Sequence, residues 1–177
     1  MRENNLKSKQ IIAFQGAPGA YSDMACREVF PEIETLPCKT FTDTFIALTK
    51  GLASLAMIPI ENSVAGRVAD IHQLLPESKL HIIAEHYQRV RHNLLACEGA
   101  SIDNIKIVRS HVHALSQCHS VIQKLNLEPQ VHADTAGAAA ELARLKDPKI
   151  AVIASTLAAQ IYKLNVLQAN VEDASHN

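Results

Sequence analysis

The sequence contains no tryptophan, and its three tyrosines and four phenylalanines make up only 4% of 177 residues. A chain this poor in aromatic rings offers few platforms on which nucleic-acid bases could stack. It also lacks an excess of either charge, because 17 Lys and Arg face 18 Asp and Glu, for a formal net charge of −1. Proteins that grip phosphates need clustered cations. We therefore expect no nucleic-acid partner.

Long apolar runs are missing as well. The apolar stretch behind the amino end, Ile11 to Phe14, suffices for one short strand and is too short for a signal peptide or a membrane span. The four cysteines show no close pairing, and we interpret them as reduced thiols of a cytoplasmic protein. They are Cys26, Cys38, Cys97 and Cys118. No membrane partner is expected.

Metal-binding and nucleotide-binding patterns are also absent. One stretch groups potential metal ligands, at His111, His113, Cys118 and His119, but no Cys-x-x-Cys or His-Glu-x-x-His spacing accompanies them. The loop 15–20 holds two glycines, yet it lacks the Gly-Lys-Ser/Thr of a P-loop and the third glycine of a dinucleotide fingerprint. This loop is explained equally well by a tight turn or by a close approach to a ligand. We predict no metal and no cofactor.

What the sequence does contain is an alternation of short apolar runs with helical patterns, typical of an α/β fold with a largely parallel sheet. The strand candidates are Ile11–Gln15, Ile33–Thr40, Leu55–Ile60, Leu80–His86, His92–Cys97, Ile105–Arg109, Gln130–Ala133, Ile150–Ala154 and Leu164–Ala169. Helical patterns lie between them, at Phe45–Leu52, Val64–Leu75, Val112–Leu125, Ala136–Leu145 and Thr156–Tyr162. Nine strands are many for one small sheet, and the polar stretch 85–92 has the character of a crossover. We predict two α/β lobes with a cleft between them.

Small polar residues recur where predicted strands pass into predicted helices. The junctions are Gln15–Ser22, Glu61–Ser63, Ser110–His111, Asp134–Thr135 and Ser155–Thr156. In open α/β sheets, ligands usually bind at the carboxyl ends of the strands, and helix starts offer free N–H groups to anions. Each junction by itself is also explained by simple helix capping. The five together predict a shared anion-binding cleft.

One junction places a carboxylate, an amide and a hydroxyl in a row, directly after an apolar strand that contains Pro59. A proline inside a strand indicates an edge or a bulge. Asn62 has a donor for a substrate carboxylate, and Glu61 could hold a proton or orient a neighbouring group. The alternative is that Glu61 and Asn62 only cap the helix predicted at Val64–Leu75.

A second junction opens a stretch with an apolar stripe, formed by Val112, Leu115, Cys118, Ile122 and Leu125. At 100° per residue, Ser110 and Gln117 then point together, roughly opposite that stripe. A hydroxyl and an amide on the polar side of a helix start suit recognition of a polar substrate group. An ordinary solvated helix face fits the same spacing, so both interpretations stay open at this point.

Blocks along almost the whole chain resemble, in order, the prephenate dehydratase family. They are Gln15–Ser22, Pro59–Gly66, His92–Ala96, Ser110–Cys118, Asp134–Ala139, Ala151–Ser155 and Asn170–Asp173. The resemblance implies two α/β lobes of mixed or parallel strands, like those of type II periplasmic binding proteins, with the active site in the cleft between them. It places residues 1–86 together with 166–177 in the first lobe and residues 87–165 in the second.

Carried onto matching positions, the resemblance also implies a substrate site. Prephenate would be contacted by Asn62, Ser110, Gln117 and Thr135, with Glu61 and Ser63 alongside. Glu61 and Thr135 are the candidate catalytic residues. The four contact positions are also ones that strand ends and helix spacing single out.

Some features depart from the family pattern. Val112 stands where the family usually has proline, and Tyr162-Lys163-Leu164 replaces its Tyr-Gly-Leu. The family's Thr-Arg-Phe motif, whose threonine is regarded as central to catalysis, would follow Asn177, and so would the phenylalanine-sensing ACT domain. The resemblance therefore implies a truncated catalytic region with weak or no turnover. Its proton donor would be the absent threonine, with Glu61 second.

The implied reaction converts prephenate to phenylpyruvate, with loss of the ring carboxylate as CO₂ and of the ring hydroxyl as water, in phenylalanine biosynthesis. Formation of the aromatic ring drives it, so the protein supplies positioning and one acid, and needs no cofactor. Arogenate, with an amino group in place of the keto group, is an alternative substrate. A non-catalytic carboxylate-binding or sensor module, or a purely structural domain, are further alternatives. The family also implies a homo-oligomer, either a dimer or a tetramer.

Overall fold

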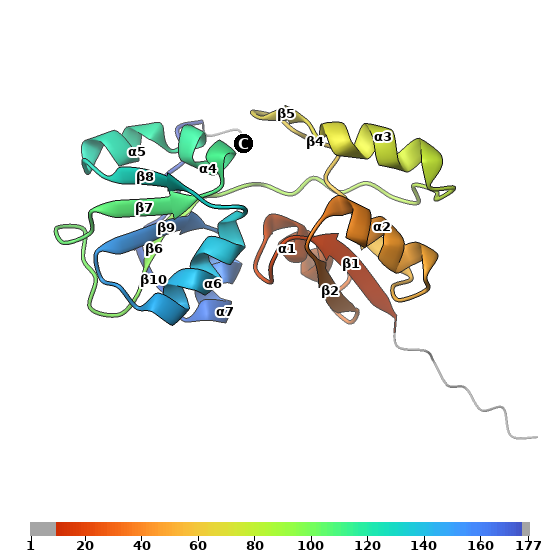
Figure 1. Ribbon diagram of the computed structural model, residues 1–177, viewed down its shortest axis with the longest axis horizontal. Coiled ribbons are helices and arrows are strands. Elements are labelled where there is room, and N and C mark those ends of the chain that lie inside the picture. The colour runs from red at the N-terminus through yellow and green to blue at the C-terminus, as the bar shows by residue number, and fades with distance from the viewer. Residues whose placement is uncertain (1–9, 175–177) are drawn as a thin grey trace, which may run out of the picture.

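The computed structural model describes residues 10–174, which form two α/β lobes joined by a long extended segment (Figure 1). Each lobe has its own sheet, and helices pack against both sheets. The two-lobed α/β architecture expected from the alternation of strands and helices is thereby confirmed.

The first lobe is built on a small parallel sheet with two helices packed against it. Its elements are β1 (Ile11–Gln15), α1 (Tyr21–Val29), β2 (Glu34–Cys38), α2 (Phe41–Thr49) and β3 (Leu55–Met57). The strand order is β2-β1-β3, and β1 is central because Ile12, Ala13 and Phe14 are apolar and fully buried. Helix α2 begins at a capping box, in which Thr40 and Asp43 each accept from the other's backbone N–H through their side chains.

A hairpin and a third helix follow this sheet. They are β4 (Glu61–Asn62), β5 (Gly66–Arg67) and α3 (Ala69–Glu77). The side-chain oxygen of Asn62 accepts from the N–H groups of Val64 and Ala65 at 2.9 and 2.7 Å, which folds the turn of the hairpin. The prediction of a helix from residue 64 onward is therefore wrong at its start, because the turn takes the first residues of the apolar stripe.

The segment that leaves the first lobe is extended but pairs with no strand. Residues 80–92 form neither helix nor strand, although Leu80–His86 was predicted as a strand. Ile82 and Ile83 are 69% and 74% exposed. An apolar run becomes a strand only where a neighbour completes its hydrogen bonds, and the sheet order β2-β1-β3 provides no such neighbour for this run.

The second lobe holds a five-stranded mixed sheet. Its strands are β6 (Asn93–Ala96), β7 (Ile107–Ser110), β8 (Glu128–Val131), β9 (Ile150–Ala154) and β10 (Asn165–Gln168), in the order β10-β6-β9-β7-β8. Its helices are α4 (Val112–Gln117), α5 (His119–Lys124), α6 (Thr135–Leu145) and α7 (Thr156–Tyr162). All five residues of β9 are buried, and alternate side chains enter the apolar cores on the two faces of the sheet. The strands β7, β8 and β9 run parallel, whereas β6 is antiparallel to β9.

The carboxyl-terminal residues belong to the second lobe, and this corrects the expectation that residues 166–177 return to the first. Strand β10 pairs with β6, and Val171 packs into the core of the second lobe. The N–H of Asp173 donates to the carbonyl of Gln117 at 2.7 Å. Of the range 166–177, residues 175–177 lie outside the described part of the chain.

Candidate functional site

The carboxyl ends of the parallel strands in the two lobes are directed toward each other. In Figure 1, β7 and β8 point toward the first lobe, and β1 runs toward the second. The hydroxyl of Ser155, directly after β9, donates to the carbonyl of Gly19, in the loop after β1, at 2.5 Å. The hydroxyl of Tyr162 donates to the carbonyl of Pro18 at 2.8 Å. Such facing strand ends are where α/β proteins place ligands.

The loop after β1 makes a very close contact with the second lobe. Gly19 has a φ of +91°, and a Cβ atom there would lie 2.7 Å from the Cα of Ala158. Its N–H donates to the buried carboxylate of Asp23 at 2.8 Å, and this carboxylate also accepts from Arg27 at 2.9 Å. The sequence allows this loop to be either a tight turn or a site of close approach to a ligand. Gly19 favours the structural interpretation, because it lets the loop pack closely against the second lobe.

A chain of polar groups crosses from the first lobe to the second. The hydroxyl of Tyr21, on α1, lies 2.8 Å from Nδ1 of His92 and 2.8 Å from the carbonyl oxygen of Arg91. The other ring nitrogen of His92, Nε2, lies 2.9 Å from Oε1 of Gln117, at the end of α4. His92 is only 2% exposed, and its backbone N–H donates to the carboxylate of Glu172 at 2.8 Å. Sequence reasoning gave no role to Tyr21 or His92.

Burial sets the charge state of this chain of groups. It lowers the pKa of His92, although the Gln117 hydrogen bond and the Glu172 carboxylate act in the opposite direction. Burial also raises the pKa of the Tyr21 hydroxyl well above its ordinary value. Both side chains are therefore neutral at pH 7, and the imidazole has one donor and one acceptor nitrogen. The hydroxyl of Tyr21 donates to the carbonyl oxygen of Arg91 and lies beside Nδ1 of His92, and Nε2 faces the side-chain amide of Gln117.

This environment predicts a pH-dependent stability. Because the pKa of His92 is lower in the folded chain than the ordinary 6.5, the unfolded chain binds a proton there at higher pH. The contribution of His92 to the free energy of unfolding is therefore complete above about pH 6.5 and is lost as the pH falls toward the folded pKa, at about 1.4 kcal/mol per unit of pKa difference. Urea unfolding of the wild type and of His92→Gln between pH 7 and pH 5 measures this loss.

The slope against pH, rather than the absolute stability, is the quantity to compare, because His92→Gln also disturbs the buried hydrogen bonds. We expect a smaller loss on acidification for His92→Gln than for the wild type. A matched control is His81→Gln, at an exposed position of the extended segment, which is expected to keep the wild-type slope. Equal slopes for the wild type and His92→Gln would contradict the prediction.

Ser110 and Gln117 do not share a polar helix face, which corrects the interpretation based on helical spacing. Ser110 is the last residue of strand β7, and its fully buried hydroxyl donates to the carbonyl of Ile153 at 2.6 Å. The single helix predicted for Val112–Leu125 is two short helices separated at Cys118. The Ser110 hydroxyl therefore ties β7 to β9, and of the two residues Gln117 is the less buried.

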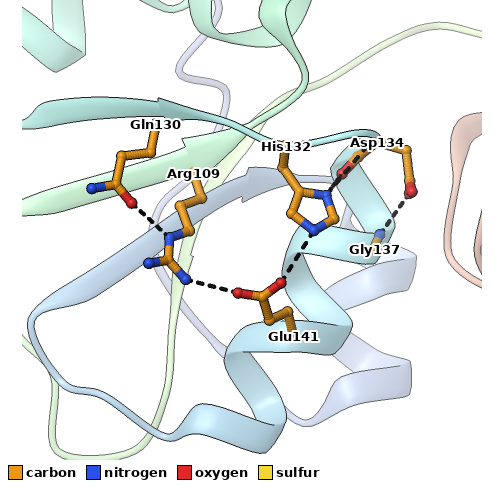
Figure 2. Close-up of polar contacts among 6 residues, drawn as sticks. All are labelled: Arg109, Gln130, His132, Asp134, Gly137 and Glu141. Carbon is orange, nitrogen blue, oxygen red and sulfur yellow. Dashed lines mark hydrogen bonds and ion pairs between the residues drawn. The ribbon is translucent and has the colours of Figure 1, made fainter.

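Thr135 is the first residue of α6, and the start of this helix is tightly built (Figure 2). Asp134 caps the helix by accepting from the N–H of Gly137 at 2.6 Å. A Cβ atom at Gly137 would lie 2.5 Å from Oδ2 of Asp134 and 3.0 Å from Cε1 of His132. The glycine two residues after Thr135 therefore makes room for the cap.

A network of charged and polar side chains supports this helix start (Figure 2). Nδ1 of His132 lies 3.0 Å from the carbonyl oxygen of Asp134, and Nε2 lies 3.3 Å from the carboxylate of Glu141. Arg109 donates to Glu141 at 2.8 Å and to Gln130 at 2.9 Å. These side chains are partly exposed, so the ion pairs add little stability by themselves. They connect β7 and β8 with α6, the helix that begins at Thr135.

The predicted site residues divide between the two lobes. Ser110, Gln117 and Thr135 follow or end the neighbouring parallel strands β7 and β8 at one edge of the second sheet. Glu61, Asn62 and Ser63 belong to the hairpin of the first lobe, where Glu61 and Ser63 are exposed and Asn62 is half-buried. Asn62 does not cap α3, because its side-chain oxygen folds the hairpin turn.

Two cavities adjoin the extended segment between the lobes. The larger, of about 400 Å³, is lined by residues of both lobes, among them Met24, Arg91 and Thr156, and the smaller, of about 320 Å³, shares Arg89 and Arg91 with it. None of the predicted site residues lines either cavity.

Among residues 10–174, no three His, Cys, Asp or Glu side chains gather closely enough to hold a metal ion. Nor does any helix in this part of the chain combine the length and apolar character needed to cross a membrane.

Comparison with known proteins points to one family. The family model of prephenate dehydratase matches residues 12–177. The bifunctional N-acyl-homoserine lactone acylase/prephenate dehydratase of Komagataeibacter europaeus is 48% identical over 97% of this chain and 61% of that protein. Arogenate dehydratase 2 of Petunia hybrida is 41% identical over 96% of this chain and 43% of its own length.

A solved structure agrees with these sequence matches. The crystal structure of prephenate dehydratase from Arthrobacter aurescens, in complex with L-Phe, has a TM-score of 0.86 at 28% identity, covering 94% of this chain and 57% of that one. The present chain spans 61% or less of each of these three proteins. The family model matches nearly the whole of this chain, and the chain shares the fold of a solved prephenate dehydratase. The chain therefore belongs to the prephenate dehydratase family.

Proposed function

We propose that this chain carries the catalytic region of an enzyme that converts prephenate to phenylpyruvate, CO₂ and water. The observation that carries the proposal is the position of Gln117 and Thr135 at one sheet edge that faces the first lobe. Prephenate is a small dicarboxylate, and an amide donor and a helix start are groups that bind carboxylates. The family match supports the same reaction.

In the proposed reaction, the bond between the ring and its carboxylate breaks, and the electron pair moves into the ring. The ring hydroxyl leaves from the opposite carbon with a proton, as water. Aromatisation makes these steps favourable, so the protein has to hold the substrate and assist the departing hydroxyl. We assign this assistance to Glu61 and Thr135, and the binding of the carboxylates to Asn62, Ser63, Gln117 and Thr135. We give Ser110 a structural role rather than a contact with the substrate, because its buried hydroxyl donates to the carbonyl of Ile153 and so ties β7 to β9.

Arogenate is the second candidate substrate, because several relatives carry its name. Arogenate dehydratase 2 of Petunia hybrida and an arogenate dehydratase/prephenate dehydratase of Arabidopsis thaliana are 41% and 39% identical to this chain. The two substrates differ only in an amino or a keto group on the side chain. Competition between equal concentrations of prephenate and arogenate, with phenylpyruvate and phenylalanine measured separately, decides between them.

The reaction is tested by measuring phenylpyruvate formed from prephenate, together with prephenate binding by calorimetry. This chain is compared with the full-length product of its gene, because the relatives extend beyond the matched region. We expect both to bind prephenate and the full protein to form phenylpyruvate. A folded full protein that neither binds nor converts prephenate or arogenate would contradict the proposed function. Binding without any turnover would favour a carboxylate-binding or sensor module.

Two further properties are part of the proposal. We infer a cytoplasmic location from the four free cysteines at positions 26, 38, 97 and 118, which fit a reducing compartment. We also infer a homo-oligomer, either a dimer or a tetramer, from the family resemblance. Light scattering of the purified full protein measures the oligomer directly.

A further inference from the structure

Two histidines lie at the start of α4, at the sheet edge that carries the proposed substrate residues. His111 directly follows β7, whose carboxyl end is directed toward the first lobe (Figure 1), and Gln117 ends the same helix. Thr135 opens the helix that follows β8, the strand paired with β7. The rings of His111 and His113 have centroids 5.0 Å apart and planes inclined at 51°. His111 therefore belongs to the same strand ends as Gln117 and Thr135.

The two ring nitrogens of His111 have different surroundings. Nδ1 accepts from the backbone N–H of His113 at 3.3 Å and so caps the start of α4. Nε2, on the other side of the ring, forms no hydrogen bond with any group of residues 10–174. The side chain is half-buried. One ring nitrogen is thus used by the fold, and the other is available to a ligand.

The surroundings of His111 keep its imidazole neutral. Burial and the imidazole of His113 lower the pKa of His111 below its ordinary value of 6.5, whereas the carboxylate of Asp134 acts in the opposite direction. His113 faces it from its own helix, and Asp134 from the turn before α6. A neutral imidazole that accepts at Nδ1 carries its proton on Nε2. The available nitrogen is therefore an N–H donor at pH 7.

An N–H donor fixed at this edge suits the oxygen of an anion. Neutral imidazoles that lie at helix starts donate to substrate oxygens in other enzymes. A metal ion is the alternative ligand for such a nitrogen, but within the described residues no third side chain gathers with His111 and His113 to hold one. One oxygen of the Asp134 carboxylate is occupied by the N–H of Gly137 at 2.6 Å, as the cap of α6. The chemistry of the free nitrogen thus favours a carboxylate.

We propose that His111 is a further substrate-binding residue, which caps α4 through Nδ1 and donates from Nε2 to a substrate carboxylate. The proposal rests on the proposed function, because it adds His111 to the prephenate site formed with Gln117 and Thr135. The cap fixes the ring, and this determines which nitrogen is offered to the substrate. The proton on Nε2 is measurable without substrate.

The variant His111→Asn separates the two roles of the ring. Asparagine is among the best helix caps, and its side-chain oxygen replaces Nδ1 as the acceptor for the His113 N–H. Its amide nitrogen takes the place of a ring carbon and does not reach the position of Nε2. His119→Asn is the matched control, because His119 is an exposed histidine at the start of the next helix, α5. Calorimetric titration of the full-length protein with prephenate measures affinity, and urea unfolding measures folding.

We expect His111→Asn to bind prephenate about three- to thirtyfold more weakly than the wild type, the effect of one lost hydrogen bond to a charged group. Its unfolding midpoint in urea is expected to equal that of the wild type, because the cap is kept. His119→Asn is expected to change neither quantity. Equal affinities of His111→Asn and the wild type would overturn the proposal, and so would an equal loss in the two variants.

A measurement on the wild type alone does not depend on how the variants fold. Nitrogen-15 NMR at pH 7 is expected to show the His111 proton on Nε2, and saturating prephenate is expected to shift the signal of that nitrogen. A proton on Nδ1, or an Nε2 signal that prephenate leaves in place, would overturn the proposal.

The outcomes separate this proposal from the proposed function. If the wild type binds and converts prephenate while neither the His111 signals nor the affinity of His111→Asn changes, the role of His111 fails and the proposed function stands. If the wild type binds no prephenate, both fail.

Discussion

Replacing Gly19 by alanine is expected to lower the free energy of unfolding by about 2–5 kcal/mol, the largest stability loss that we predict for a single added methyl group. Two costs combine at this position. The φ of +91° is unfavourable for any residue with a Cβ, and that Cβ would lie 2.7 Å from the Cα and 3.0 Å from the nitrogen of Ala158. Because Ala158 offers backbone atoms in helix α7, it cannot move aside as a flexible side chain would.

Gly51 provides the matched control for this prediction. Its φ is also positive, at +68°, but a Cβ there would meet nothing within 4 Å. Gly51→Ala therefore carries only the backbone cost, about 1–2 kcal/mol. Urea unfolding measures the loss of unfolding free energy in each variant. The difference between the two losses is the cost of the steric contact between Gly19→Ala and α7. Equal losses for Gly19→Ala and Gly51→Ala would show that the loop after β1 does not press against α7.

A second readout shows which contact is lost in Gly19→Ala. The hydroxyl of Ser155 both caps α7, by accepting from the N–H of Ala158 at 3.0 Å, and donates to the carbonyl of Gly19. A shift of the Gly19 loop leaves the cap in place and removes only the bond between the lobes. Hydrogen exchange of the Ala158 amide should therefore stay slow in the variant.

The sequence predicts the elements whose apolar residues are buried inside one lobe. Strands β1 and β9 coincide with their predicted ranges because each is a short apolar run that fills the centre of a sheet. Helix α7 matches its predicted bounds because Ser155 provides a cap at its start. In these cases, local composition and the tertiary environment favour the same structure.

The predictions fail where a short-range feature or a missing neighbour decides the structure. The carboxamide of Asn62 folds a hairpin turn where the apolar spacing favours a helix. The break at Cys118 divides the predicted helix in two, which separates Ser110 from the face that carries Gln117. The run with Ile82 and Ile83 has the composition of a strand, but pairing depends on a neighbouring strand that local composition does not reveal.

The placement of the candidate residues was predictable in part. Ser110 and Thr135, which were singled out at junctions between strands and helices, lie at the carboxyl ends of the neighbouring parallel strands β7 and β8. The link between Tyr21 and His92 was not predictable, because 71 residues separate its two partners along the chain. The only local signal is a histidine placed directly before the buried strand β6, where an apolar residue would be expected.

Replacing Gln117 by glutamate is expected to weaken prephenate binding about 10- to 100-fold with little change in folding, if Gln117 binds a substrate carboxylate as proposed. The glutamate keeps the length of the side chain. It also keeps an oxygen at the position of Oε1, which lies 2.9 Å from Nε2 of His92 in the wild type. The amide nitrogen, in contrast, is replaced by a second carboxylate oxygen. A donor to the substrate is thereby lost and a like charge is added, at a cost of about 1.4–2.8 kcal/mol in binding.

Gln123→Glu is the control for the added charge, because Gln123 is an exposed residue of α5 and not part of the proposed site. It introduces the same charge change on a nearby helix, and we expect prephenate affinity within about twofold of the wild type because exposed charges are screened by salt. Calorimetric titration of prephenate into both variants, at low and moderate salt, gives the comparison. If Gln117→Glu and Gln123→Glu lose affinity equally, the effect is general electrostatic repulsion. A loss confined to Gln117→Glu that persists at moderate salt instead supports direct contact between this amide and the substrate carboxylate.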